Sequence, residues 1–319
     1  MKYKEDIRLV SKELTVENTT YCGAHCIMCP RHKYRFDWKH MDMSLFKSII
    51  DQAVELGMES LDACGFGDPF MDPEFKEKLA YVKTKYSCIK VYTSATGHLL
   101  TSERRAWIGQ YIDTLKISHY GFTKEVFEKV HRGSLQFEKV IKNIESLFAI
   151  PKENRPYIIM LFLVFPENEH QIEEWKHYWK SKADEVIVWL PHNYGGGHYT
   201  EPLEKVKMRD SNPRSCGRPF KGNLFVRENG EVSMCCFDFN RQLIIGDLRQ
   251  HTLRKILEGN LLRKIREVHR AKTFSESEYI CRHCDQIYSR EGALLYATNE
   301  IREVGILTSH ADLVNDMLK

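Results

Sequence analysis

Three cysteines lie on one short loop near the start of the chain. Cys22, Cys26 and Cys29 follow the spacing C-x3-C-x2-C in the segment ENTTYCGAHCIMCPR, with no fourth cysteine nearby. A structural zinc site normally has four protein ligands, whereas a reactive metal centre keeps one position open. The loop therefore indicates a metal centre with one free position, unless His25 or His32 completes a zinc site.

A second group of cysteines lies in the last third of the chain: Cys216, Cys235, Cys281 and Cys284, the last two as C-x2-C. Four thiolates can close the coordination shell of zinc or of an iron–sulfur cluster. Taken alone, this group favours a zinc ribbon. Cys236 is left over beside it, either as an inert buried thiol or as a reactive one.

The elements that position the first loop are short β-branched runs alternating with amphipathic stretches. Strands are predicted at 14–19, 60–67, 89–94, 113–121, 157–165 and 184–191, and helices at 44–57, 74–85, 137–148 and 172–182. Strands joined by helical crossovers are typical of parallel α/β folds, in which the chemistry lies at the carboxyl ends of the strands. The three-cysteine loop follows the first strand, at that end.

The alternation stops after residue 191. Residues 192–215 are rich in glycine, proline and polar residues and are predicted to form a linker or a loop over the barrel mouth. Residues 216–290 form a smaller cysteine-bearing domain, with a hairpin turning at Asn229-Gly230 and a helix at 252–269. Residues 291–319 are predicted to be helical. We therefore predict a domain at 1–191, this connection, and the two C-terminal units.

The three-cysteine loop, with its βα repeats, resembles the radical S-adenosylmethionine superfamily. The resemblance implies an α/β fold, a partial (β/α)6 TIM-like barrel. It implies that Cys22, Cys26 and Cys29 hold a [4Fe-4S] cluster whose open iron binds S-adenosylmethionine. Reductive cleavage would give a 5′-deoxyadenosyl radical that abstracts hydrogen from substrate, and the electron would come from a donor such as flavodoxin or ferredoxin.

The same resemblance implies a set of contacts to S-adenosylmethionine. GFGDP at 65–69 resembles the family's Gly-Gly-Glu-Pro segment, although Phe66 replaces a glycine and Asp68 the glutamate. Ser118 matches a serine at the fourth strand, and Arg132 either pairs with the carboxylate or forms a surface salt bridge. The implied cofactor-binding residues are Met28, Gly65, Gly67, Asp68, Ser118 and Arg132.

The second cysteine group resembles the SPASM extension of these enzymes, in its shortened twitch form. The pattern Cys216-x13-Gly230-x4-Cys235 followed by CRHC carries the resemblance. The full SPASM pattern continues with further cysteines, but no cysteine follows Cys284 here. The resemblance therefore implies one fully ligated auxiliary cluster and two [4Fe-4S] clusters in total.

The predicted catalytic residues are Cys236, Tyr120 and His192. Cys236 corresponds in position to a cysteine with which radical epimerases of the family return a hydrogen atom. Tyr120 and His192 fall at strand ends. Other candidates for substrate contact are His119, Asn193 and Tyr194, followed by Asp62, Arg218 and Asp238.

Three functions remain open from the sequence. The first is oxidation of a carbinol in a carbohydrate, aminocyclitol or sugar-nucleotide, with an auxiliary cluster taking the second electron. The second is radical epimerisation of a sugar or a peptide. A peptide is less favoured, because no leader-binding module is recognisable before residue 14. The third is a zinc or iron–sulfur binding or redox-sensing protein without turnover.

Composition limits the partners and the compartment. The net charge of +3 arises from 47 basic and 44 acidic residues spread along the chain, which argues against nucleic acid or an anionic membrane as partner. The longest apolar stretch, Tyr157–Phe165, is too short to span a bilayer, and the N-terminal segment MKYKEDIRLVSKEL does not contain the apolar core of a signal peptide. The expected location is the cytoplasm, where cysteines serve as metal ligands rather than disulfides. Cys64 and Cys88 are expected to be buried packing residues.

Overall fold

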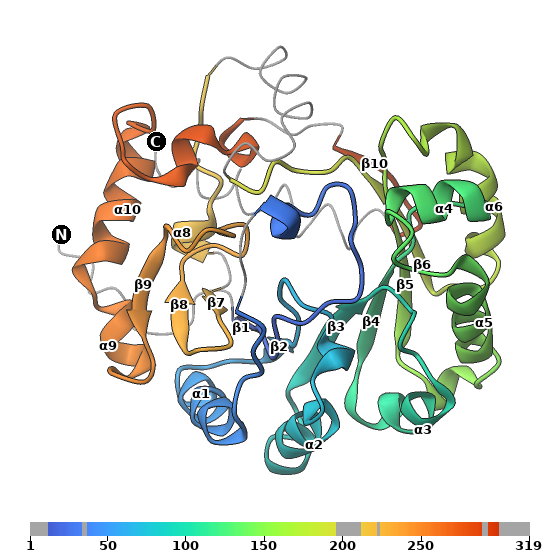
Figure 1. The fold of residues 1–319 in the computed structure, drawn as a ribbon. Coiled ribbons are helices and arrows are strands. Elements are labelled where there is room, and N and C mark those ends of the chain that lie inside the picture. Colours follow the sequence, from blue (N-terminus) through green and yellow to red (C-terminus); the bar gives the residue numbers. More distant parts are fainter. Residues whose placement is uncertain (1–11, 34–36, 196–211, 222–223, 289–292, 300–319) are drawn as a thin grey trace.

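The computed structural model of the chain describes residues 12–33, 37–195, 212–221, 224–288 and 293–299. Within these residues, ten strands form one sheet in the order β10-β6-β5-β4-β3-β2-β1-β7-β8-β9. Figure 1 shows the strands as an open arc with helices around its outside. The predicted connection 192–215 lies outside the described residues except at its two ends.

Strands β1 to β6 pair in parallel, each with the next, and helices join them. This confirms the partial (β/α)6 barrel. The strands are β1 (Glu13–Val16), β2 (Ser60–Asp62), β3 (Lys90–Ala95), β4 (Thr114–Ser118), β5 (Tyr157–Leu163) and β6 (Glu185–Trp189). Alternate residues of β4, Leu115 and Ile117, are fully buried. Lys116 and Ser118 therefore lie on the opposite, inner face.

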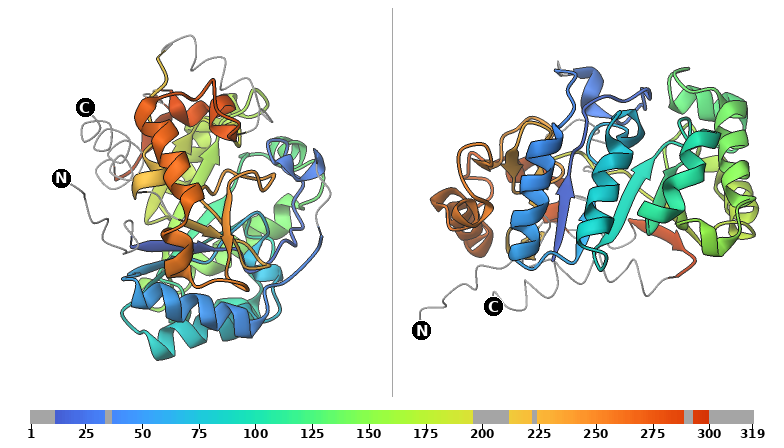
Figure 2. Two further views of the ribbon diagram at one scale, coloured as in Figure 1. Left: turned by 90° about the vertical axis from the view of Figure 1, so that its left-hand side faces the viewer. Right: turned by 90° about the horizontal axis from the view of Figure 1, so that it is seen from below.

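The helices of the barrel are α1 (Met43–Glu55), α2 (Phe75–Lys85), α3 (Ser102–Tyr111), α4 (Lys124–Val130), α5 (Phe137–Phe148) and α6 (Ile172–Lys180). Their apolar stripes face the sheet; α1, for example, buries Phe46, Ile49 and Ile50. Helices α1 and α2 lie side by side on the outer face (Figure 2). The sequence analysis did not predict α3 and α4.

The C-terminal strands extend the barrel sheet at its β1 edge. They are β7 (Leu224–Val226), β8 (Glu231–Ser233) and β9 (Ile244–Asp247). β7 pairs with β1 in parallel, while β8 and β9 add antiparallel. The hairpin turn at Asn229-Gly230 is confirmed, and Gly230 has a φ of +93°, which favours glycine. The four-cysteine segment is thus attached to the strand that leads into the three-cysteine loop.

Short helices complete this part of the molecule: α8 (Arg218–Lys221), α9 (Leu253–Leu257), α10 (Asn260–Ala271) and the 3-10 turns η5 (Ile280–His283) and η6 (Asp285–Ile287). The single helix predicted at 252–269 is wrong, because the chain breaks at Gly259, which becomes the N-cap of α10. The tight approach of Ile256 to this position leaves no room for a side chain there.

Two other predictions are corrected. Part of the predicted C-terminal helical segment is instead β10 (Leu294–Ala297), antiparallel to β6 (Figure 1); residues beyond 299 lie outside the described part. Cys88 is exposed rather than buried, because it lies in the turn between α2 and β3. Among the described helices, none combines the length and the apolar character needed to cross a membrane.

Candidate active site

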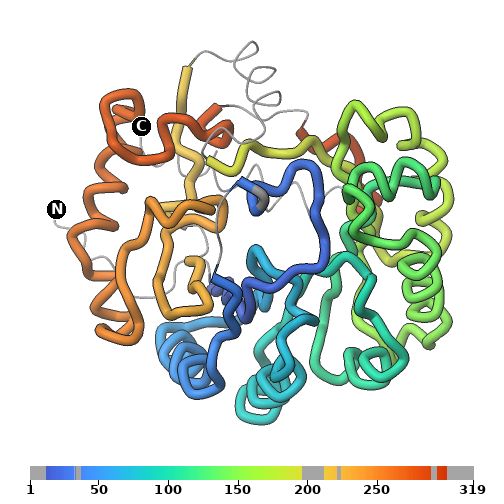
Figure 3. The backbone as a smooth tube through the Cα atoms, viewed as in Figure 1, coloured from blue at the N-terminus to red at the C-terminus, as the bar shows by residue number. Residues whose placement is uncertain are grey.

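The three-cysteine loop leaves the carboxyl end of β1 and passes across the centre of the arc of strands in the view of Figure 3. Backbone and side-chain hydrogen bonds fix it to the α4 region: Ile27 N–H donates to Val130 O at 2.9 Å, and His25 N–H to Ser134 Oγ at 2.9 Å. A further bond, Cys29 N–H to Cys26 O at 3.0 Å, closes the turn between these two cysteines. The loop is therefore held in shape by the framework before any ligand is considered.

The three thiols lie close enough to influence one another. Burial, followed by the nearby Asp68 carboxylate, raises the pKa of Cys22 to about 12. Burial and then the two neighbouring thiols raise that of Cys26. Burial also raises the pKa of Cys29, against the opposing charges of Arg31 and Arg132. Thiols held in this way must lose their protons to bind a metal. The positive charge of the metal centre supplies the driving force for this deprotonation.

The segment GFGDP lies directly against the three-cysteine loop. Asp68 N–H donates to Tyr21 O at 2.8 Å, and a Cβ added to Gly67 would come within 2.1 Å of Thr19 O. Only glycine fits such an approach of two backbones. Arg31 joins the two segments from the other side, since its Nη1 donates to Phe66 O at 2.9 Å.

Asp68, predicted to contact S-adenosylmethionine, is buried in the framework. Its Oδ1 accepts from Phe70 N–H at 3.0 Å, and its Oδ2 lies 3.5 Å from His98 Nδ1. His98 in turn packs against Gly23 of the cysteine loop. Asp68 therefore shapes the segment 65–69 in this structure.

The other predicted cofactor contacts surround the same loop. Met28 is buried, Ser118 ends β4, and Arg132 is exposed with a φ of +51° and its charge close to Cys29. Tyr120 is buried beside Cys26, and its ring stacks on His131 at 5.7 Å between centroids. Apart from Met28, which belongs to the loop itself, these residues come from the end of β4 and from the segment after α4.

The four-cysteine group lines one cavity. Cys216, Cys235, Cys281 and Cys284 contribute to its wall, together with Arg218, Phe237 and a set of apolar side chains, Met234, Leu243, Ile280 and Ile287 among them. Within the described residues, no three His, Cys, Asp or Glu side chains converge as closely as ligands of a single metal ion do. The thiols instead surround a space between them.

Asn193 and Asp238, both predicted from the sequence to contact the substrate, belong to the framework of this cavity. Asn193 Nδ2 donates to His283 O at 2.6 Å, and its Oδ1 accepts from Asp285 N–H at 3.2 Å, which fixes the CRHC turn. Asp238 Oδ2 accepts from Leu243 N–H at 2.8 Å and from Ser233 Oγ at 3.0 Å. His119 is likewise buried, and its Nδ1 accepts from Trp175 Nε1. The framework thus engages all three side chains, and substrate contact by these residues stays a prediction.

Tyr194, His192 and Cys236 connect the surroundings of the two cysteine sites. Tyr194 is close to Cys29 and Tyr120 on one side and to Cys236 on the other. His192 packs on Phe237, the residue after Cys236, at 3.7 Å between ring centroids. Cys236 is half-buried. A hydrogen bond with Cys235 lowers its pKa to about 6, helped by the charge of Arg218.

Asp62 lies on the inner face of the barrel, within electrostatic range of Cys236. It ends β2, and the fully buried Leu61 before it occupies the outer face. Burial raises the pKa of Asp62 to about 8; the charges of Glu13 and Cys236 add to this rise, and Lys116 opposes it. The inner face thus offers a carboxyl group, an ammonium group and a thiol to a polar molecule.

The sequence motifs did not reveal Glu17 and Arg227, two buried charged residues near the segment 65–69. Glu17 follows β1, where a charged residue directly after an apolar strand could have been noticed. Arg227 follows β7 and carries no signal, because its neighbours come from distant parts of the sequence.

Two family models match this chain. The radical SAM superfamily model matches residues 16–178, and the model of the SPASM iron–sulfur cluster-binding domain matches residues 216–285. The first covers just over half of the chain, so the protein belongs to the radical SAM superfamily. It is therefore an enzyme that uses a [4Fe-4S] cluster and S-adenosylmethionine, and its SPASM domain implies additional iron–sulfur cluster binding.

A curated relative is the tungsten-containing aldehyde ferredoxin oxidoreductase cofactor-modifying protein of Pyrococcus furiosus. The two are 25% identical in a 175-residue alignment that covers 52% of this chain and 48% of the relative. The chain thus spans about half the length of that protein.

Solved structures share the fold at low identity. BtrN in complex with AdoMet and 2-DOIA has a TM-score of 0.58 and 16% identity, covering 87% of this chain and 94% of BtrN. Streptococcus suis SuiB bound to its precursor peptide has a TM-score of 0.65 and 15% identity, covering 81% and 67%. The enzyme anSMEcpe with bound AdoMet and a peptide has a TM-score of 0.61 and 15% identity, covering 96% and 98%.

The residues present fit the implied groups. The first loop offers three thiols and no fourth, and thiolates are the ligands of [4Fe-4S] clusters. The second site offers four thiols around one cavity, which suits a cluster with a closed shell. Its ligand set is also one that zinc accepts, but the matching family model is that of an iron–sulfur domain.

Proposed function

We propose that this enzyme oxidises a carbinol in a small polar substrate, such as a carbohydrate, an aminocyclitol or a sugar-nucleotide. In this proposal Cys22, Cys26 and Cys29 hold the radical-generating cluster. The second group, Cys216, Cys235, Cys281 and Cys284, holds one auxiliary [4Fe-4S] cluster. The observation that carries the proposal is the cavity with four thiols, because a closed auxiliary site next to the barrel interior can accept an electron from a substrate bound there.

When bound, the clusters and S-adenosylmethionine supply the hydrogen-abstracting radical and take up the second electron of the oxidation. The chain itself must bind and orient the substrate and remove the hydroxyl proton. Asp62 is the proposed acceptor for that proton, because it ends β2 on the inner face of the barrel, and its raised pKa of about 8 makes its ionised form a stronger base than an ordinary aspartate. Tyr120 and His192 border the two sites and orient the substrate between them.

The contacts to S-adenosylmethionine are assigned to Met28, Gly65, Gly67, Asp68, Ser118 and Arg132. The close packing of 65–69 on the cysteine loop supports this assignment, because it presents backbone atoms of one segment beside the thiols of the other. Radical SAM enzymes need a reductant, and we assign this role to a flavodoxin or a ferredoxin. We assign the enzyme to the cytoplasm, where cysteines serve as metal ligands rather than disulfides.

A second candidate function is radical epimerisation, in which Cys236 returns a hydrogen atom to the substrate radical. The half-buried Cys236, close to both Asp62 and Tyr194, favours it. The structural neighbours SuiB and anSMEcpe are bound to peptides, so peptides belong in the substrate screen beside sugars.

The test is turnover in deuterated water with candidate substrates of both kinds, by wild type and Cys236→Ala. An oxidase yields a product two mass units lighter without solvent deuterium, and Cys236→Ala retains most of its turnover. An epimerase incorporates solvent deuterium through the exchangeable thiol and loses turnover in Cys236→Ala. Solvent deuterium in the product would therefore overturn the oxidase in favour of the epimerase.

A further inference from the structure

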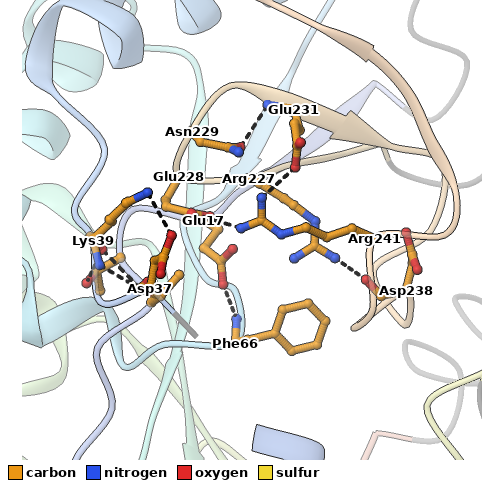
Figure 4. A network of polar contacts seen from close by, with 12 residues as sticks. Glu17, Asp37, Lys39, Phe66, Arg227, Glu228, Asn229, Glu231, Asp238 and Arg241 are labelled. Carbon is orange, nitrogen blue, oxygen red and sulfur yellow. Dashed lines mark hydrogen bonds and ion pairs between the residues drawn. The ribbon is translucent and has the colours of Figure 1, made fainter. Parts of the chain in front are cut away.

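A buried ionic network connects the segment 65–69 with the C-terminal strands (Figure 4). On the barrel side, Glu17 extends from the end of β1, and its Oε1 accepts from Phe66 N–H at 2.7 Å. Glu17 is fully buried, and its charge interacts with those of Arg227 and Glu228, which follow β7. The pairing of β1 with β7 brings these residues together, since Val16 and Val226 are opposite each other.

On the C-terminal side, Arg227 continues the network toward the cysteines. Its Nη2 donates to Asp238 O, and its guanidinium lies 5.4 Å from the centroid of the Phe66 ring. The carboxylate of Asp238 in turn fixes the chain around it, accepting from Gln242 N–H at 2.8 Å. Asp238 is three residues from Cys235. The guanidinium of Arg227 therefore contacts both the segment 65–69, which packs on the three-cysteine loop, and the loop that follows Cys235.

The remainder of the network is closed by Arg241. Its Nη2 donates to Glu228 at 3.0 Å and its Nη1 to Glu231 at 2.6 Å. Glu17 Oε2, Glu228 Oε2 and the Nε and Nη1 of Arg227 are buried without a hydrogen-bond partner among the described residues. The charge of Arg227 favours the ionised form of Glu17, whereas burial and Glu228 oppose it, so removal of Arg227 leaves Glu17 without this opposing charge.

We propose that Glu17 and Arg227 are positioning residues that couple the S-adenosylmethionine-binding segment 65–69 to the auxiliary-cluster loop 235–241. Glu17 holds the backbone of Phe66, and Arg227 lies over the Phe66 ring and donates to the loop that follows Cys235. A change at Arg227, in the SPASM part of the chain, therefore weakens binding of S-adenosylmethionine to the barrel. The inference rests on the proposed contact of residues 65–69 with S-adenosylmethionine.

The coupling is tested with reconstituted holoenzyme by measuring the Kd of S-adenosylmethionine, together with iron per chain and the EPR spectrum of each reduced cluster. Glu17→Ala and Arg227→Met should each weaken binding by about tenfold, or about 1.4 kcal/mol, as expected for a lost hydrogen bond to a buried charged group. Glu17→Gln retains an acceptor for Phe66 N–H and should stay within about threefold of wild type. Arg227→Lys should restore part of the affinity that Arg227→Met loses.

The matched control is Arg249→Met. Arg249 also joins the two parts of the chain, through a 2.8 Å bond to Asp42, but this pair is exposed, and Arg249 bonds to the backbone oxygen of Asn229 rather than to Glu17 or Arg227. It should bind S-adenosylmethionine as wild type does. Iron-replete Arg227→Met with wild-type affinity would overturn the coupling. If Arg227→Met does not load iron, the coupling is overturned instead when Arg227→Lys and Glu17→Ala both bind S-adenosylmethionine with wild-type affinity.

Failure of the inference is distinguishable from failure of the proposed function. An unchanged Kd for S-adenosylmethionine in Gly67→Ala would show that residues 65–69 do not contact it. That result would contradict the assigned contact itself. Normal binding by wild type with no effect of Glu17→Ala or Arg227→Met would contradict only the coupling.

Discussion

The two cysteine sites are built in opposite ways. The first takes its three thiols from eight consecutive residues, 22–29, on a loop held by backbone hydrogen bonds. The second takes four thiols from residues 216–284, brought together by a hairpin, two 3-10 turns and the buried Asn193. The first site is therefore local and open to a ligand, whereas the second depends on the tertiary structure and is closed. Loss of the first should leave the fold intact, and loss of the second should not.

The largest expected effect comes from changing Cys22, Cys26 and Cys29 together to alanine. Iron should fall from about eight to about four per chain after anaerobic reconstitution, and formation of 5′-deoxyadenosine should be abolished. The measurement is iron and labile sulfide per chain, with 5′-deoxyadenosine determined by chromatography. Cys88→Ala is the matched control, since this exposed thiol is distant from both sites. Stoichiometric zinc with little iron in wild type would contradict the cluster assignment.

Cys281→Ala tests the second, four-cysteine site. It removes one wall of the four-thiol cavity and one anchor of the C-terminal segment, so the apparent unfolding temperature should fall by several degrees. The first cluster should remain, and the variant should still cleave S-adenosylmethionine without oxidising substrate. Thermal unfolding under anaerobic conditions and EPR of the reduced protein measure both effects. Loss of both clusters together would show that the two sites do not form independently.

The fold and the first site were largely readable from the sequence, because their signals are local. The loop spacing and the Asn229-Gly230 turn each lie within a few residues, and the βα alternation repeats over short segments; the alternation and the turn are confirmed in the structure. What could not be predicted depends on distant partners. No pattern indicates that β7 pairs with β1, nor that Glu17 meets a residue 210 positions later in the chain. Helix α10 and β10 show the limit as well, since a glycine and an edge pairing overrode the helical periodicity.

Gly67→Ala should have a smaller effect, confined to the open site. An added Cβ would come within 2.1 Å of Thr19 O, a backbone atom that can only move with the cysteine loop. We expect iron content to persist while affinity for S-adenosylmethionine falls by at least about tenfold. Gly133→Ala provides a control for a glycine outside this contact: nothing lies within 4 Å of its added Cβ, although its φ of +69° adds local strain. Equal losses of affinity in the two variants would mean that general strain, rather than the contact, is responsible.

The smallest effect is a pH dependence at the junction of the two sites. Burial raises the pKa of Glu17 from its usual value to about 7, with Arg227 opposing the rise and Glu228 adding to it. A group whose pKa is higher in the folded than in the unfolded protein contributes stability at low pH and loses it as pH rises, here between about pH 4.5 and 7. Glu17→Gln removes this titration. The unfolding temperature of Glu17→Gln relative to wild type should therefore increase from pH 5 to pH 8. A change of about 1 kcal/mol in the free energy of unfolding corresponds to a few degrees.

Thermal melts at both pH values measure the difference. The control is Asp42→Asn, which removes the exposed carboxylate that pairs with Arg249 and should show no such rise. A difference that stays constant with pH would mean that Arg227 compensates the charge of Glu17 completely.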